Sequence, residues 1–123
     1  MIKENPNEKF ANERISIMEA IVKILNIDIH KVSIQDKDFL TYMWLEKSGK
    51  SNYIARFSQT PWYTLIYINK RTLSLLKFDK RTAEAIANYI REKSKTDREL
   101  RIYTETAEDK KPSLILDDCL DVR

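Results

Sequence analysis

The spacing of hydrophobic residues changes twice along this chain, and that change limits the fold more than any other feature. Near residues 12–26 and 80–95, apolar residues recur every three or four positions, which is the period of a helix with one buried face. Between residues 39 and 78 they alternate with polar residues, which is the period of a strand with one buried face. This order predicts an antiparallel sheet bounded by two helices.

The two predicted helices have recognisable starts. Asn12 is a candidate N-cap for the first helix, and Asp79 for the second. The expected buried stripes are Ile15, Met18, Ile21, Val22 and Leu25 in the first helix, and Ala83, Ile86, Ala87 and Ile90 in the second.

The middle of the chain is divided into strands by polar turns. Alternation in the second strand places Tyr53, Ala55 and Phe57 on one face, and Ile54 and Arg56 on the other. Trp44 and Trp62 are expected in the core, because large aromatic side chains dominate small cores. The predicted strands are residues 39–46, 53–57, 62–68 and 72–78, with shorter extended segments at 27–34 and 100–103.

These elements predict an α+β fold: an antiparallel β-meander of four to five strands flanked by an N-terminal and a C-terminal helix, as a two-layer sandwich. A chain of 123 residues suits one domain, which we assign to residues 1–103. A charged C-terminal tail follows at 104–123, and the sequence leaves open whether part of it is ordered. The single cysteine, Cys119, allows no internal disulfide and is compatible with a reducing compartment. Without a signal-peptide pattern or a membrane-length apolar run, we expect a cytoplasmic protein with no membrane association.

Residue types needed for common chemistry are scarce. Gly49 is the only glycine, whereas average usage would give about nine, which excludes glycine-rich phosphate loops. His30 is the only histidine, and Cys119 has no neighbours at metal-ligand spacing. The acidic residues Asp117, Asp118 and Asp121 suit a solvated tail. We therefore predict no enzyme activity, no catalytic residues, no metal site and no cofactor.

Positive charge is concentrated in one segment. The net charge is +3, but residues 66–101 contain ten Lys or Arg against five Asp or Glu. Basic residues interleaved with aromatic ones suit phosphate contacts and base stacking, although solvated charge and aromatic core packing would give the same pattern. The candidate nucleic-acid contacts are Arg56, Lys70, Arg71, Lys77, Lys80 and Arg81, and the candidate partner-binding aromatics are Tyr53, Tyr63 and Tyr67.

The order of segments across residues 13–90 resembles the small C-terminal module of predicted type I restriction endonuclease-like proteins. The chain departs from that pattern by inserting residues 53–57 and by lacking a nuclease-like region, so no catalytic residue carries over. The resemblance implies an accessory binding domain near DNA or in a defence system. The segments that carry it are Ala20 to Leu25, Val32 to Asp36, Phe39 to Leu45, Tyr63 to Lys70 and the return to Phe78.

The leading hypothesis is a non-enzymatic binding module for nucleic acid, from a bacterial defence system or a mobile element. The alternative is a small protein–protein interaction protein, such as a phage-encoded inhibitor of a host defence enzyme, with homodimerisation through the sheet as its simplest form. A metal-dependent nuclease is the third hypothesis, and no predicted strand end carries two acids and a lysine to support it.

Overall fold

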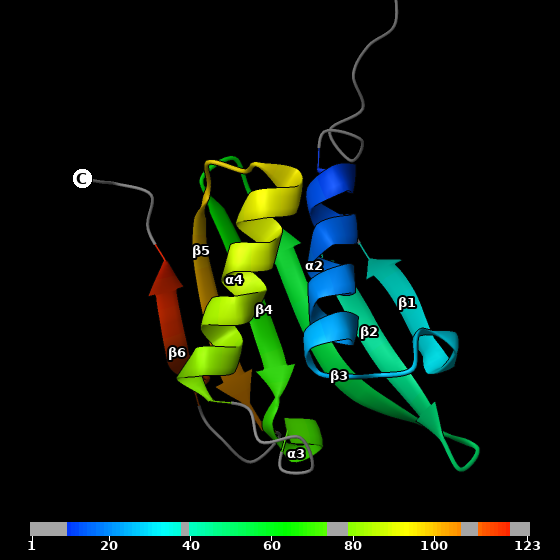
Figure 1. The fold of residues 1–123 in the computed structure, drawn as a ribbon. Helices are drawn as coiled ribbons and strands as arrows, with labels where there is room; N and C mark the ends of the chain where they lie inside the picture. The colour runs from blue at the N-terminus through cyan, green and yellow to red at the C-terminus, as the bar shows by residue number, and fades with distance from the viewer. Residues whose placement is uncertain (1–9, 38–39, 74–78, 107–110, 119–123) are drawn as a thin grey trace, which may run out of the picture.

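The structure is a computed structural model that describes residues 10–37, 40–73, 79–106 and 111–118. Two long helices lie beside each other along one sheet (Figure 1). The α+β class predicted from the sequence is confirmed. In chain order the elements are α2 (Ala11–Ile24), η1 (Ile29–Lys31), β1 (Val32–Lys37), β2 (Leu40–Lys47), β3 (Lys50–Gln59), β4 (Tyr63–Asn69), α3 (Lys70–Leu73), α4 (Lys80–Ser94), β5 (Glu99–Glu105) and β6 (Ser113–Asp118).

The sheet is mixed and larger than predicted. Its six strands lie in the order β1-β2-β3-β4-β5-β6, and every neighbouring pair is antiparallel except β4 and β5, which run parallel. A parallel pair needs a long crossover connection, and the 15 residues of α4 provide it. The prediction of an antiparallel meander of four to five strands is therefore wrong, because hydrophobic alternation identifies strands without revealing their direction.

Two further differences concern the ends of strands. Where the sequence predicted a turn at residues 69–71 and a return strand at 72–78, the chain enters α3 at Lys70, and residues 74–78 lie outside the described part. Beyond the predicted domain boundary at residue 103, β5 continues to Glu105 and β6 pairs with it. Part of the predicted tail therefore belongs to the sheet.

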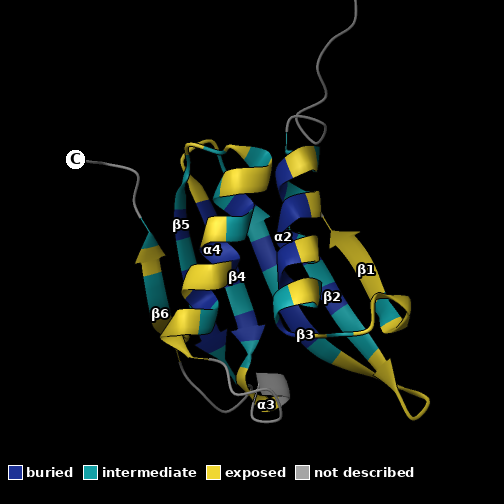
Figure 2. Cartoon of the chain, viewed as in Figure 1, coloured by how far each residue is buried: buried dark blue, intermediate teal, exposed yellow. Residues whose placement is uncertain are grey.

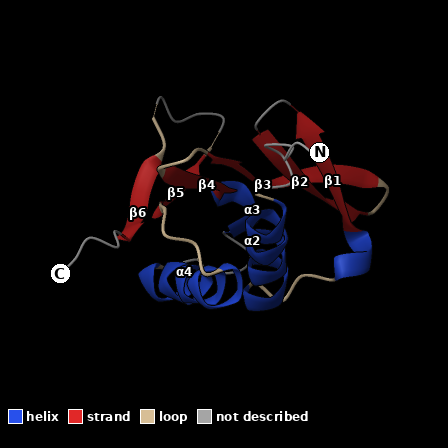
Figure 3. Ribbon diagram, turned by 90° about the horizontal axis from the view of Figure 1, so that it is seen from above, coloured by secondary structure: helices blue, strands red, loops and turns tan. Residues whose placement is uncertain are grey.

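Both long helices cover the same face of the sheet, which is plain when the molecule is viewed from above (Figure 3). The core lies between these two layers, and buried positions follow the inner sides of the helices and the central strands (Figure 2). The predicted stripe of α4 is confirmed, since Ala83, Ile86, Ala87 and Ile90 are all buried. The largest fully buried apolar side chains that the sheet adds to this core are Met43, Ile54, Phe57, Ile66, Ile68, Leu100 and Ile102.

The buried side of α2 is rotated from the predicted stripe. Ile15 is 45% exposed, whereas Ile17, which the stripe omitted, is fully buried. The reason is that the buried side includes two polar residues, Glu13 and Ser16, which a hydrophobic pattern does not count. Nor does Asn12 cap the helix, because α2 begins at Ala11. By contrast, the Asp79 carboxylate accepts a hydrogen bond from the Thr82 backbone N–H at 2.9 Å and caps α4 as predicted.

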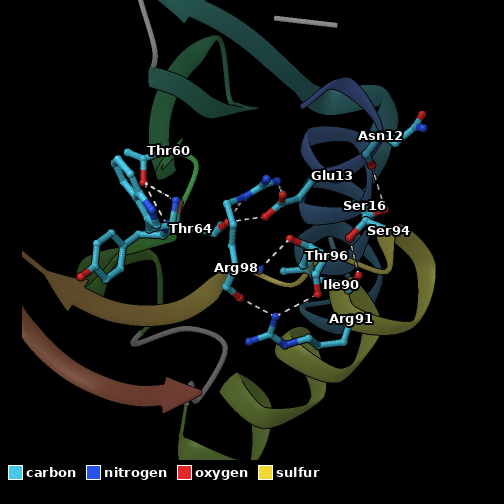
Figure 4. A network of polar contacts seen from close by, with 12 residues as sticks. Asn12, Glu13, Ser16, Thr60, Thr64, Ile90, Arg91, Ser94, Thr96 and Arg98 are labelled. Carbon is cyan, nitrogen blue, oxygen red and sulfur yellow. Dashed lines mark hydrogen bonds and ion pairs between the residues drawn. The ribbon is translucent and has the colours of Figure 1, made fainter. Parts of the chain in front are cut away.

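Glu13 belongs to a buried polar network that joins α2 to β4 and to the loop before β5 (Figure 4). Its carboxylate pairs with the Arg98 guanidinium and accepts a hydrogen bond from the Thr64 hydroxyl. The Phe10 ring covers the Arg98 guanidinium, whose central carbon lies 4.5 Å from the ring centroid. The side chains of Glu13 and Arg98 are only 3% and 11% exposed, so each charge depends on the other.

Arg91 holds the loop between α4 and β5 in place (Figure 4). Its guanidinium donates to the backbone carbonyls of Thr96 and Arg98. It also donates to the Asp118 carboxylate at 3.1 Å and the Asp118 carbonyl at 2.8 Å. One side chain thus ties the end of α4, the loop before β5 and the end of β6 together.

We expect the Glu13–Arg98 pair to be the most costly polar interaction to break. Replacing Arg98 with methionine would leave the Glu13 carboxylate buried without its counter-ion, and should lower the free energy of unfolding by about 3–5 kcal/mol. Arg14→Met is the matched control, because Arg14 lies 3.8 Å from the half-exposed Asp36 carboxylate and its loss should cost less than about 1 kcal/mol. Urea denaturation followed by circular dichroism measures both. Equal losses in the two variants would contradict this assignment.

Candidate binding face of the sheet

The sheet face turned away from α2 and α4, here called the open face, has no helix over it among the described residues (Figure 3). Its side chains alternate with the buried ones along each central strand. Cross-strand register places Tyr42 opposite Arg56, Arg56 opposite Tyr67, and Tyr67 beside Tyr103. A row of three tyrosines and one arginine therefore crosses β2, β3, β4 and β5.

A carboxylate on β5 holds the arginine of this row. Glu105 accepts two hydrogen bonds from the Arg56 guanidinium, at 2.8 and 3.0 Å, and a third from the Tyr53 hydroxyl at 3.0 Å. Arg56 lies on β3 and Glu105 on β5, so the ion pair spans the intervening strand. The guanidinium carbon of Arg56 lies 4.2 Å from the centroid of the Tyr67 ring on the intervening strand, β4.

Both faces of the Tyr67 ring are covered. Arg56 approaches from β3, and the Tyr103 ring stacks on it from β5, with centroids 4.9 Å apart and an interplanar angle of 14°. A similar cation–π contact occurs on the same face, where the Arg101 guanidinium carbon lies 5.1 Å from the Tyr63 ring centroid. These rings pack side by side across the strands instead of lying flat for a ligand to stack on.

Both arginines of the open face, Arg56 and Arg101, are paired with carboxylates. Arg56 is matched by Glu105, and Arg101 approaches Asp117 at 3.3 Å and Glu99 at 3.6 Å. The hydrogen bonds with Glu105 are the largest cause that raises the pKa of Arg56. Burial, followed by the charge of Glu105, raises the pKa of Tyr53 far above its ordinary value, so its hydroxyl remains a donor. Burial is also the main cause that raises the pKa of Tyr67.

A β-bulge brings Tyr53 to the open face together with Arg56. The pairing of β2 with β3 shifts between Met43 and Trp44, so that Ile54 and Ala55 are both buried although they are consecutive. The prediction that Tyr53 shares a face with Ala55 is therefore wrong, because strict alternation fails at a bulge. The same shift places Tyr53 opposite Trp44.

Beside this bulge the open face has a shallow hollow of about 390 Å³, here called the aromatic hollow. The Trp44 and Tyr53 rings are 5.5 Å apart at 56°, and the Tyr42 and Tyr53 rings 6.5 Å apart at 51°. Inclined rings form walls instead of a flat stack. The residues that line the aromatic hollow are Tyr42, Trp44, Tyr53, Arg56 and Glu105.

The structure separates the sequence-predicted site residues into two groups. Tyr53, Arg56, Tyr63 and Tyr67 lie on the open face, as described above. Four exposed cations lie instead in α3, which follows β4, and at the start of α4, both at the bottom of Figure 1. Lys77 lies outside the described residues. This second group, here called the basic end, consists of Lys70, Arg71, Lys80 and Arg81.

Sequence reasoning missed four residues of the open face: Tyr42, Trp44, Tyr103 and Glu105. Trp44 was expected in the core, yet it lines the aromatic hollow, and Trp62 is 70% exposed. The available signal was position along the strand. Tyr42 and Trp44 alternate with Thr41 and Met43, and in the structure the latter two are buried whereas the former two are half-buried. Glu105 carried no such signal, because its role depends on the register of β4 with β5.

A groove of about 840 Å³ adjoins the aromatic hollow, since Trp44 and Tyr53 line both. It continues toward the basic end through Arg71. The polar residues along it include three cations, two acids and three amides: Lys31, Lys47, Arg71, Asp28, Glu46, Asn26, Asn52 and Asn69.

The raised pKa of Tyr53 predicts a loss of stability at alkaline pH. Above about pH 10, tyrosines of the unfolded chain ionise while Tyr53 in the native state stays protonated, so the native state binds more protons and the free energy of unfolding falls. Tyr53→Phe should cost about 1 kcal/mol at neutral pH through the lost hydrogen bond to Glu105. The difference in the free energy of unfolding between Tyr53→Phe and the wild type should become smaller above about pH 10. Urea titrations at several pH values test this, and a constant difference would contradict it.

Comparisons with known proteins add no relative: no family model matches the chain, and neither a curated protein nor a solved structure matches it. None of the described helices is long and apolar enough to span a membrane.

Proposed function

We propose that this chain is a non-enzymatic binding module whose open face docks a protein partner. The observation that carries the proposal is a six-stranded sheet with both long helices on one face and a row of Tyr, Trp and Arg side chains on the other. These three residue types supply most of the energetic hot spots in protein interfaces. A second copy of the chain is the simplest such partner.

The charge on the open face favours a protein over a phosphate backbone. Phosphate recognition uses cations that are free to replace counter-ions. On the open face, Arg56 already pairs with Glu105, and Arg101 with Asp117 and Glu99. Base stacking also needs an accessible ring face, whereas both faces of Tyr67 are covered. Paired charges between aromatic anchors suit the desolvated centre of a protein interface.

Affinity capture with matched variants tests this proposal. Tyr103→Ala removes a ring from the open face, and Tyr89→Ala removes one from the helical side, where Tyr89 hydrogen-bonds Glu19. We expect Tyr103→Ala to reduce capture of a specific partner at least about tenfold, as for a hot-spot residue, and Tyr89→Ala to leave it unchanged. Quantitative mass spectrometry measures the capture, and sedimentation shows whether the partner is a second copy. The same protein set with both variants would refute the proposal.

Nucleic-acid binding is the second candidate, and the basic end favours it. Lys70, Arg71, Lys80 and Arg81 are exposed, and they lie in α3 and at the start of α4, both at the lower end of the molecule in Figure 1. The adjoining groove adds Lys31 and Lys47. This form of the proposal keeps the setting implied by the sequence resemblance, an accessory protein of a bacterial defence system or mobile element.

Fluorescence anisotropy with labelled single- and double-stranded DNA and RNA tests the second candidate. Lys80→Gln with Arg81→Gln should weaken binding to all sequences and flatten the plot of log affinity against log salt by roughly one to two units. Lys37→Gln with Lys93→Gln is the matched control, because these exposed lysines lie where β1 and α4 end, at the opposite end of the sheet in Figure 1. An equal effect of both pairs would place the contacts elsewhere.

A further inference from the structure

The aromatic hollow is lined by three rings inclined to one another and by one ion pair. Trp44 and Tyr42 flank Tyr53 at angles of 56° and 51°. Arg56 and Glu105 complete the lining and form a bidentate pair, so the lining carries no net charge. A ligand group that enters therefore meets mainly the electron-rich faces of aromatic rings.

Ring faces attract cations, because the quadrupole of an aromatic ring places negative charge above its plane. The open face already contains two such contacts, Arg56 over Tyr67 and Arg101 over Tyr63. An anion would meet those negative ring faces and the Glu105 carboxylate. The positive charge of Arg56 is already neutralised by Glu105, to which its Nε and Nη2 donate.

The hydrogen bonds within the hollow decide which cation fits. A primary ammonium carries three N–H donors that must find acceptors when they leave water. The strongest acceptor present, Glu105, already accepts three hydrogen bonds from Arg56 and Tyr53. A quaternary ammonium has no N–H to satisfy and spreads its charge over methyl groups that contact rings well. The hollow therefore suits a methylated ammonium better than a free one.

We propose that the aromatic hollow of Tyr42, Trp44 and Tyr53 binds a quaternary ammonium group, supplied by a trimethylated lysine side chain of the protein partner. The inference rests on the proposed docking of a protein at the open face and adds which chemical group of that partner the face recognises. The positive charge of the ligand is matched to the aromatic rings. Its lack of N–H donors is matched to the Glu105 carboxylate, which already accepts three hydrogen bonds and has about four acceptor positions.

Tetramethylammonium is the probe that isolates this chemistry, and neopentyl alcohol is a neutral molecule of similar shape. The chain contains two tryptophans, so Trp62→Phe leaves Trp44 as the only tryptophan reporter. At constant ionic strength, tetramethylammonium chloride should change Trp44 fluorescence saturably and shift its own methyl proton resonance upfield. It should bind at least about threefold more tightly than neopentyl alcohol, the factor that an exposed cation–π contact supplies. Equal binding of the two probes, or no saturation, would overturn the proposal.

Two substitutions of Tyr42 provide the matched pair. Tyr42→Phe keeps the ring and should keep tetramethylammonium binding within about twofold, whereas Tyr42→Leu keeps an apolar side chain without a ring and should weaken it at least about threefold. Thermal melting confirms that both are folded, and equal affinities in the two variants would refute the role of the ring. A peptide with trimethyllysine should then bind more tightly than the same peptide with unmodified lysine, and the reverse order would also refute the proposal.

Failure of this inference is distinguishable from failure of the proposed function. Tyr103 does not line the aromatic hollow, so capture that depends on Tyr103 tests docking at the open face independently of the ammonium site. Capture lost in Tyr103→Ala without tetramethylammonium binding would leave the docking face and remove the ammonium site. Capture that Tyr103→Ala leaves unchanged, together with no tetramethylammonium binding, would remove both proposals.

Discussion

The parallel pairing of β4 with β5 is the constraint on which the rest of this structure depends. Two parallel neighbours cannot be joined by a tight turn, so the chain must leave the sheet and return along a crossover, which is α4. The helix packs beside α2 on one face and completes the core there. Among the described residues, the opposite face is thereby left without a helix, to the side chains of the strands. The same register sets Tyr103 beside Tyr67 and brings Glu105 within reach of Arg56 across β4.

This dependence explains which features could be predicted from the sequence. Periodicity located both long helices and the central strands, because an element with one buried face has apolar residues at a regular spacing along the chain. It gave the buried stripe of α4 and the Asp79 cap correctly, since both are local. It could not give the direction of β5, because Leu100 and Ile102 would alternate in the same way in either orientation. The ion pair between Arg56 and Glu105 follows only from that direction.

The remaining errors come from polar groups in places where a hydrophobic pattern expects none. Glu13 and Ser16 are buried on α2, so the stripe predicted from apolar residues was rotated. The burial of Glu13 is tolerable because Arg98, from the loop that α4 leads to, supplies its counter-charge. At the open face the pattern failed for another reason: the bulge between β2 and β3 reverses the direction of Tyr53 relative to strict alternation. Both exceptions are tertiary effects without a local signature.

These exceptions are also what pre-organises the aromatic hollow. Because the bulge fixes Tyr53 opposite Trp44, and the Tyr53 hydroxyl donates to Glu105, the central ring of the hollow is held at both ends. Arg56 is held in turn by the same carboxylate and by the Tyr67 ring beneath it. Side chains restrained before binding lose little conformational entropy when a ligand arrives. A shallow site on a sheet can therefore discriminate between ligands by charge and by hydrogen-bonding capacity, although it encloses them only partly.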